Sequence, residues 1–299
     1  MSAPRNTIGH RLIGNAKWLD GVAKVFGSAV GGFYKLPGTR PIKNVLHGTW
    51  PLNHPLHPAL TDATVGGYTA MVFLDVLYLI TKEPALLRAA DAVLVFSFAT
   101  SLLSVISGLT DWNETYGEER RNGMLHGLVM VTATVLFIVS LWLRVGGGSR
   151  EAAIVIGILG WLVMTFGAYI GGDQVFGYGT QVNRQAWSNT PTKWQQLEVA
   201  ANGLEDRKPV VAKTKEGVAV FVAKVDGQVY AIANVCTHAG GPLNEGKWVG
   251  ADRCEIECPW HASRFCVKDG GVVGGPATFG EPSFETRVTD KGFLEVRAR

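Results

Sequence analysis

Four long apolar stretches constrain the fold of this chain more than any other feature of its sequence. They cover residues 64–80, 92–110, 124–143 and 152–172, and the last three contain 19, 20 and 21 residues without Asp, Glu, Lys or Arg. About 20 apolar residues suffice for a helix to cross a hydrocarbon core of ~30 Å. A soluble helical bundle would carry a polar face on each helix. We therefore expect a four-transmembrane-helix bundle, all-α, in residues 62–172.

The basic residues predict the orientation of these helices. Four spans place both termini on one side, and loops on the cytoplasmic side are enriched in Lys and Arg. The terminal side would receive Arg5, Arg11, Lys17, Lys24, Lys35, Arg40, Lys43, Arg120, Arg121, Arg184 and Lys193, and the opposite side only Lys82, Arg88, Arg144 and Arg150. We expect a multi-pass protein of the bacterial inner membrane with cytoplasmic termini. Residues 1–17 contain no apolar core typical of a signal peptide.

Residues 1–61 form a basic, amphipathic segment before the first span. Apolar side chains recur at helical spacing in residues 18–33, and four glycines weaken that helix. The segment could lie on the anionic inner leaflet of the lipid bilayer or pack against the protein. The net charge of +3 comes from this segment, so it favours membrane anchoring and not nucleic acid as a partner.

Three polar side chains of the membrane half are candidate functional residues. His57 precedes the first span and His126 begins the third, so both are expected on the terminal side, where together they could bind a haem b. The alternative is that both histidines only cap helices or contact interfacial water. Asp75 lies about 20 Å along the first span at 1.5 Å per residue. A carboxylate at that depth is costly, so it needs a partner, a proton or a polar cavity.

The C-terminal part has a different pattern. Residues 173–192 are glycine-rich and then polar, which predicts a linker. Residues 193–299 contain short β-type runs, and two pairs of runs flank Asp226-Gly227 and Asp290-Lys291-Gly292, which are hairpin signals. We expect an all-β domain here, so the chain is multidomain.

Two Cys/His pairs in this domain have metal-ligand spacing. They are Cys236-x-His238 and Cys258-x-x-His261. A zinc site with two cysteines and two histidines usually spaces each pair by two to four residues, and the first pair is tighter. The spacing is that of a Rieske [2Fe–2S] cluster, in which two thiolates hold one iron and two imidazoles the other. With the run from Cys258 to Phe265, residues 193–299 resemble the Rieske family.

This resemblance implies roles for individual residues. Cys236 and Cys258 would bind the inner iron, and His238 and His261 the outer iron. Ser263 would hydrogen-bond toward a cluster sulfur, and Gly274, Gly275 and Pro276 would form the loop that shields the cluster from water. These eight residues stand where the family has its cluster loops.

The other cysteine positions indicate the Rieske type. Quinol-oxidising Rieske proteins carry a disulfide between the cluster loops, but Gly241 and Trp260 occupy those positions here. The resemblance is therefore to the ferredoxin type, with a potential near the low end of the range, about −150 mV. Cys254 and Cys266 are expected to be packing residues.

The membrane half also resembles a known family. The segments around His47, His57, Asp75, Asp111 and His126 resemble an uncharacterised bacterial four-helix membrane domain that is found fused to Rieske domains.

The combined expectation is a membrane-anchored Rieske protein that transfers single electrons between a reductase or quinol and an unknown redox acceptor. The alternatives are a redox or iron sensor subunit and a haem-b-containing oxidoreductase subunit. A complete Rieske oxygenase would need a mononuclear iron site after the cluster, and only 38 residues follow His261.

Overall fold

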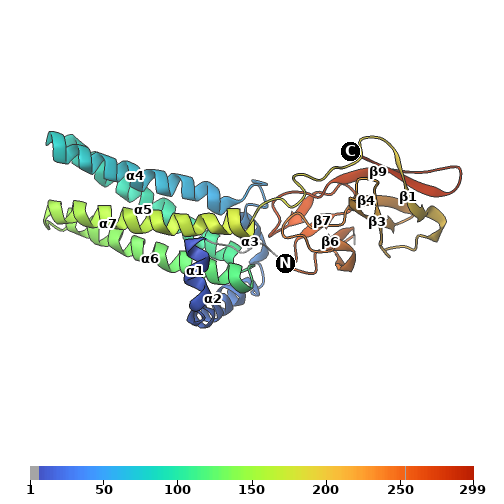
Figure 1. Ribbon diagram of the computed structural model, residues 1–299, viewed down its shortest axis with the longest axis horizontal. Coiled ribbons are helices and arrows are strands. Elements are labelled where there is room, and N and C mark those ends of the chain that lie inside the picture. Colours follow the sequence, from blue (N-terminus) through green and yellow to red (C-terminus); the bar gives the residue numbers. More distant parts are fainter. Residues whose placement is uncertain (1–6, 253) are drawn as a thin grey trace. The chain divides into compact units, whose positions relative to one another are not determined.

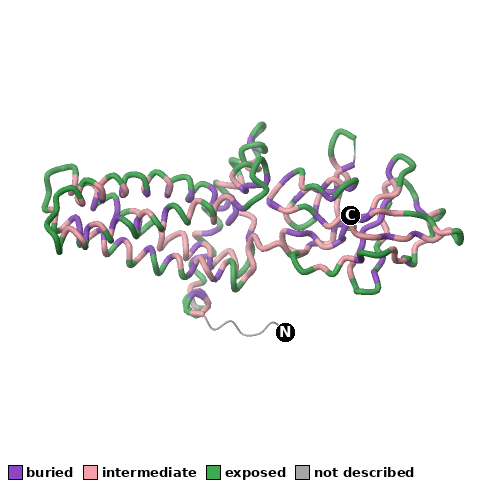
Figure 2. Tube along the Cα trace, turned by 90° about the horizontal axis from the view of Figure 1, so that it is seen from above, coloured by how far each residue is buried: buried purple, intermediate pink, exposed green. Residues whose placement is uncertain are grey.

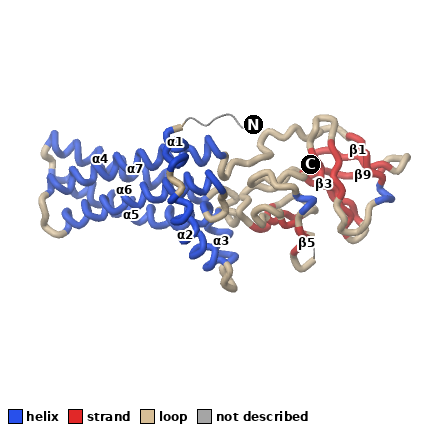
Figure 3. The backbone as a smooth tube through the Cα atoms, turned by 60° about the horizontal axis from the view of Figure 1, so that its bottom comes forward, coloured by secondary structure: helices blue, strands red, loops and turns tan. Residues whose placement is uncertain are grey.

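The computed structural model describes residues 7–252 and 254–299. Arg5, which counted toward the basic terminal side, lies outside the described residues. The chain separates into two compact units, residues 1–42 with 56–179 and residues 43–55 with 180–299. The first unit is helical and the second is built on strands (Figures 1 and 3).

In the helical unit, long helices run side by side as a bundle (Figure 1). The described residues contain four helices that are long and apolar enough to span a membrane, which confirms the predicted number. Shorter helices precede them. The helices are α1 (Ile8–Asn15), α2 (Trp18–Tyr34), α3 (Arg40–His47), α4 (Leu56–Thr81), α5 (Pro84–Trp112), α6 (Gly117–Val145) and α7 (Arg150–Gly172), the last continued by a π-helical turn, Asp173–Tyr178.

Every span is longer than the apolar stretch that predicted it, and side-chain caps define the starts of two of them. Glu83 caps α5 by accepting a hydrogen bond from the Ala85 N–H, and Pro84 occupies the first helical position. Ser149 caps α7 in the same way through the Ala152 N–H. The spans therefore include residues beyond the apolar stretches, among them Arg144.

The four spans form two similar hairpins, α4–α5 and α6–α7. Buried side chains follow the same spacing on α4 and on α6. They are Thr64, Tyr68, Met71 and Asp75 on α4, and Ala133, Phe137, Ser140 and Arg144 on α6. Buried residues of α5 and α7 also share one spacing. They are Ala90, Leu94, Ser97, Ser101, Ser104 and Ser107 on α5, and Ala153, Gly157, Gly160, Met164, Gly167 and Ile170 on α7. Equivalent positions meet in the core, where the Tyr68 and Phe137 rings stack with centroids 3.7 Å apart. The membrane domain is thus an internal duplication.

Figure 2 shows this arrangement through the burial of the residues: buried positions recur along the spans between stretches of exposed ones.

Glycines allow close contact inside the second hairpin. A Cβ at Gly160 would lie 3.1 Å from the Phe137 ring, and one at Gly167 would lie 2.7 Å from the Met130 sulfur. Small residues at such contacts are typical of helix packing in membranes.

Helices α1 and α2 pack against α6. Helix α2 buries Leu19, Ala23 and Gly27, whereas Trp18 and Phe26 of its apolar stripe are exposed. Val22 of the stripe packs against the helical core, whereas the exposed Trp18 and Phe26 do not and remain candidates for lipid contact.

The second unit contains two antiparallel sheets within the described residues. One has six strands in the order β1-β10-β9-β4-β3-β2 and the other has four in the order β5-β6-β7-β8. The strands are β1 (Gln195–Ala200), β2 (Val210–Lys213), β3 (Ala219–Val225), β4 (Gln228–Ala233), β5 (Lys247–Val249), β6 (Glu255–Glu257), β7 (Arg264–Cys266), β8 (Val272–Gly274), β9 (Ser283–Val288) and β10 (Phe293–Ala298).

Both predicted hairpins are present. Strands β3 and β4 pair from Val225 opposite Gln228, and Asp226 and Gly227 both have positive φ, as a type I′ turn requires. Strands β9 and β10 pair in the same antiparallel way. One hydrophobic cluster joins Phe221 and Ile232 of the larger sheet to Ile256 and Phe265 of the smaller one, so the core between the sheets also fixes the loops that leave them.

Candidate metal centre

Two loops with the same backbone conformation carry the predicted cluster ligands. In the β4–β5 connection the Cys236 N–H donates to Gly241 O, and Gly240 N–H donates to Cys236 O, at 2.9 and 2.8 Å. In the β6–β7 connection the Cys258 N–H donates to Ser263 O, and Ala262 N–H donates to Cys258 O, at 2.8 and 3.0 Å. Each turn contains a residue with positive φ, Gly240 or Ala262. The two turns present their cysteines in equivalent positions.

The two thiols meet in the core. Cys236 and Cys258 are almost fully buried, and their side chains share a hydrogen bond. This contact, helped by burial, raises the pKa of Cys236, whereas the same hydrogen bond lowers the pKa of Cys258 to about 7. Two buried thiols that share a proton are the donor set for a cationic centre, because a metal favours both thiolates.

The two predicted imidazole ligands also lie together. The rings of His238 and His261 have centroids 4.9 Å apart. Burial and, less strongly, the nearby His261 and His47 lower the pKa of His238 to about 3, so this imidazole is neutral, as metal ligation requires. Its buried Nδ1 has no hydrogen-bond partner within the described residues. An orphaned nitrogen of this kind fits an iron ligand.

The four side chains form two pairs and do not surround one point. Among the residues that the structure describes, no group of three or more His, Cys, Asp or Glu side chains could hold a single ion. The thiols pair with each other and the imidazoles pair with each other. The donor set therefore fits a two-iron cluster with two ligands on each iron.

The third loop, after β8, lies beside this centre. Ser263 is fully buried, and its Oγ accepts a hydrogen bond from the Ala277 N–H at 3.0 Å. This contact does not use the hydroxyl hydrogen of Ser263, and its hydrogen bond to a cluster sulfur stays a prediction. Pro276 is buried and carries no N–H donor, so it suits a shield against water.

A buried carboxyl supports the first cluster loop. The Glu281 Oε1 accepts a hydrogen bond from the Thr237 N–H at 2.7 Å, and Thr237 donates through its hydroxyl to Phe279 O at 2.8 Å. Burial raises the pKa of Glu281 to about 8. No pattern in the sequence indicated this residue, since a glutamate in a loop is usually solvated.

The remaining cysteines behave as expected. All four cysteines are free thiols, and Cys254 packs in the core with Ile256 and Cys258. At Gly241 an added Cβ would lie 2.8 Å from the Cys258 sulfur and 3.0 Å from the Trp260 ring. Trp260 therefore fills the space in which a disulfide between the loops would lie.

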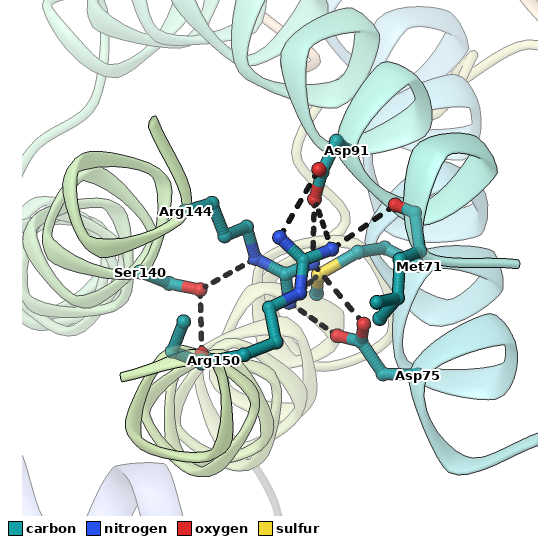
Figure 4. A network of polar contacts seen from close by, with 8 residues as sticks. Met71, Asp75, Asp91, Ser140, Arg144 and Arg150 are labelled. Carbon is teal, nitrogen blue, oxygen red and sulfur yellow. Dashed lines mark hydrogen bonds and ion pairs between the residues drawn. The ribbon is translucent and has the colours of Figure 1, made fainter. Parts of the chain in front are cut away.

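The chain also contains a buried charge network inside the bundle (Figure 4). Asp75 forms an ion pair with Arg144, and both side chains are fully buried. Arg144 also binds Asp91 at 2.9 Å, and Asp91 binds Arg150 at 2.7 Å. Asp75 is thus partnered, one of the three expected outcomes. Asp91 lies near the start of α5 and Arg144 in the last turn of α6, and the sequence pattern of charges at helix ends did not show that the two side chains pair.

His57 and His126 are brought together by the duplication. Both lie inside helices, His57 in the first turn of α4 and His126 well within α6, and their ring centroids are 6.4 Å apart. The Nδ1–H of His57 donates to Ser104 O at 2.9 Å, and that of His126 donates to Gly167 O at 2.8 Å. A repeated motif, Asn53-x-x-Leu56-His57 and Asn122-x-x-Leu125-His126, is the sequence signal of this pairing.

Comparisons with known proteins agree with this architecture. Residues 194–285 match the family "Rieske [2Fe-2S] domain", and residues 53–184 match "Predicted membrane protein (DUF2231)". The chain is 35% identical over 86 residues to the naphthalene 1,2-dioxygenase system ferredoxin component of Pseudomonas putida, covering 29% of this chain and 78% of that protein. It is 38% identical over 65 residues to the 3-phenylpropionate/cinnamic acid dioxygenase ferredoxin subunit of Escherichia coli K12, covering 22% and 58%.

Among solved structures, the ferredoxin of carbazole 1,9a-dioxygenase from Nocardioides aromaticivorans IC177 is 27% identical, with a TM-score of 0.32, covering 36% of this chain and 99% of that one. The fold and the paired donors define an iron–sulfur protein of the electron-transfer class. The chain belongs to the Rieske [2Fe–2S] family, through a ferredoxin-type domain fused to a predicted membrane domain.

Proposed function

We propose that this protein is a membrane-anchored electron carrier that passes single electrons between a reductase or quinol and a redox acceptor. The observation that carries the proposal is the pair of equivalent turns, which place two buried thiols and two adjacent imidazoles at one end of the sheets. The relatives support it, because they are the ferredoxin component of one dioxygenase system and the ferredoxin subunit of another dioxygenase.

In this proposal Cys236 and Cys258 hold one iron, and His238 and His261 hold the other. The cluster supplies the one-electron redox step. The protein keeps His238 neutral by burial, holds Ser263 next to the third loop, and excludes water with Pro276. These features set the potential through solvation and hydrogen bonding.

The proposed location is the bacterial inner membrane with the cluster domain in the cytoplasm. The four spans support membrane insertion, and the excess of basic residues on the terminal side supports the orientation. The exposed side chains of the α2 stripe, among them Trp18 and Phe26, would lie in the headgroup region of that leaflet. Free thiols in the cluster domain suit a reducing compartment.

Electron exchange with a soluble reductase tests the main proposal. The purified protein, mixed anaerobically with NADH and a ferredoxin reductase of a dioxygenase system, should bleach reversibly in the visible range as the cluster is reduced. Reoxidation by a one-electron acceptor should restore the colour on every cycle. A cluster that responds only once, or only to chemical reductants, would favour the sensor alternative.

A second candidate function follows from His57 and His126, a haem b site in the membrane domain. Each Nδ1 donates to a backbone carbonyl, so the lone pair of each ring is on Nε2, the usual arrangement of a histidine ligand. The two ring centroids lie 6.4 Å apart, and a metal-bound nitrogen lies ~2.0 Å from its metal, so His57 and His126 would be the residues that hold the iron of a haem b.

The optical spectrum tests this site. If the site binds haem, protein made with ample haem should show a Soret band, and either His57→Ala or His126→Ala should abolish it while the cluster signal stays. His54 is an exposed histidine outside the pair, so His54→Ala is the matched control and should keep the band. A wild-type spectrum without a Soret band would assign the paired histidines a role in helix packing only.

A further inference from the structure

The segment Lys43–Pro55, which we call the strap, lies far from the cluster loops in sequence but belongs to the same compact unit. It comprises the end of α3 and the chain that leads to α4. Its central residues His47, Gly48 and Thr49 are buried, although they come before the membrane domain. What buries them is the third loop of the metal centre.

Three contacts join the strap to this loop. The Asn44 Oδ1 accepts a hydrogen bond from the Gly275 N–H at 3.1 Å. The Thr49 hydroxyl donates to Ala277 O at 2.8 Å in a fully buried contact. The Gly275 Cα faces His47 and Thr49 so closely that a Cβ there would lie 3.1 Å from His47 Cδ2. The strap therefore contacts the residues before and after Pro276, which are Gly275 and Ala277.

The loop has only partial support from its own domain. Ser263 accepts the Ala277 N–H from the cluster side, while the Ala277 carbonyl and the Gly275 N–H are satisfied by the strap. Without the strap these two buried backbone groups would need water. Water entering at Pro276 would reach the side of the centre that this loop covers.

The strap is also internally organised for this contact. The Thr49 N–H donates to Asn44 O at 2.9 Å, and the His54 N–H donates to Gly48 O at 3.0 Å. Gly48 has φ +80°, a conformation that glycine adopts without strain. These bonds hold Asn44 and Thr49 together on one side of the turn.

We propose that Asn44 and Thr49 are positioning residues of the metal centre, which hold the Gly275–Ala277 backbone closed over the cluster and keep water out. This inference rests on the proposed cluster. It assigns to a segment before the membrane domain a part of the redox site, so the reduction potential and the lifetime of the cluster depend on residues outside the Rieske domain match.

Variants of Thr49 test the proposal. Thr49→Val removes the hydroxyl and keeps the shape. Loss of one buried hydrogen bond costs about 1 kcal/mol, which corresponds to an open loop populated about fivefold more often. Removal of iron by a hydrophilic chelator should then be about fivefold faster. The midpoint potential should also rise, because water stabilises the more negative reduced cluster.

Four further variants make the result specific. Thr49→Ser restores the donor and should return both values toward wild type. Thr286→Val removes a similar bond, from the Thr286 hydroxyl to Val229 O at 3.0 Å, within the same unit but on β9, and should leave both unchanged. Asn44→Leu should act like Thr49→Val. Asn44→Asp keeps the oxygen that accepts from the Gly275 N–H, so it should stay near wild type in both the chelation rate and the potential.

The outcomes separate this inference from the proposed function. If wild-type protein lacks a cluster, the proposed function fails. If the cluster is present but Thr49→Val and Thr286→Val give equal chelation rates and potentials, the strap is a passive tether and the inference is wrong.

Discussion

Asp75 and Arg144 form an ion pair with both side chains fully buried inside the four-helix bundle. They occupy equivalent positions in the two hairpins, one on α4 and one on α6. The two hairpins thus carry opposite charges at this equivalent position. Because no water is available at that depth, each charge depends on the other, and Asp91 and Arg150 extend the network toward the hairpin ends (Figure 4).

Breaking this pair on one side should be more damaging than removing it. Arg144→Leu leaves the buried Asp75 carboxylate uncompensated, which costs about 3–5 kcal/mol, whereas Asp75→Leu leaves Arg144 paired with Asp91 and should cost less. The double variant removes both charges and should be more stable than Arg144→Leu, although Asp91 loses one of its two arginine partners. Thermal unfolding in detergent, followed by tryptophan fluorescence, measures the difference. Additive effects of the two substitutions would contradict a coupled pair.

The glycines beside the paired histidines should be sensitive to a single methyl group. A Cβ at Gly171 would lie 2.9 Å from His126 Cε1, whereas one at Gly127 would meet nothing within 4 Å. Gly127→Ala should be neutral or stabilising, by up to about 1 kcal/mol from helix propensity. Gly171→Ala should lower the melting temperature because the imidazole must move. Equal melting temperatures would mean that the ring has room to shift.

The stability of the β unit should depend on pH through Glu281. Burial raises its pKa to about 8 from the ordinary value of 4.5 for a glutamate. Between these two values the unfolded chain releases the proton and the folded chain keeps it, so the stability contribution is full below about 4.5 and is lost as the pH rises to 8.

The Glu281→Gln variant checks that dependence. Glutamine keeps an oxygen for the Thr237 N–H but cannot ionise. Its melting temperature should therefore fall less than that of wild type between pH 5 and pH 8.5. A parallel fall in both proteins would assign the pH dependence to other groups.

Membrane orientation can be measured with reporters. A fluorescent protein fused after Arg299 should be bright, and alkaline phosphatase fused there should be inactive, because the basic residues favour a cytoplasmic C-terminus. Phosphatase fused at Lys82, between α4 and α5, should be active. Activity at Arg299 instead would reverse the proposed orientation and place the free thiols in an oxidising compartment.

Local patterns in the sequence predicted most of the fold. The uncharged apolar runs identified the four spans, Asp226-Gly227 identified a type I′ hairpin, and Cys236-x-His238 with Cys258-x-x-His261 predicted the two loops that the structure brings together. Each of these signals acts within a few residues, so it can be interpreted without knowledge of the tertiary structure.

Long-range contacts could not be predicted in the same way. Arg144 looked like a charge at a helix end, because its partner Asp75 comes from another hairpin. Thr49 and Ala277 meet only through tertiary folding, and neither position has an unusual local pattern. The duplication was detectable in principle, since Asn-x-x-Leu-His occurs at both histidines, but its significance depends on the matching burial of α4 and α6.

The most direct test of the account is the EPR spectrum of the reduced, detergent-solubilised protein. A Rieske cluster with two histidine ligands should give an average g value below that of an all-cysteine cluster, with two irons and two acid-labile sulfides per chain. His261→Ala should abolish that signal, and Cys254→Ser, which changes a packing cysteine, should retain it. Stoichiometric zinc without labile sulfide, or a signal that survives in His261→Ala, would contradict the proposed metal centre.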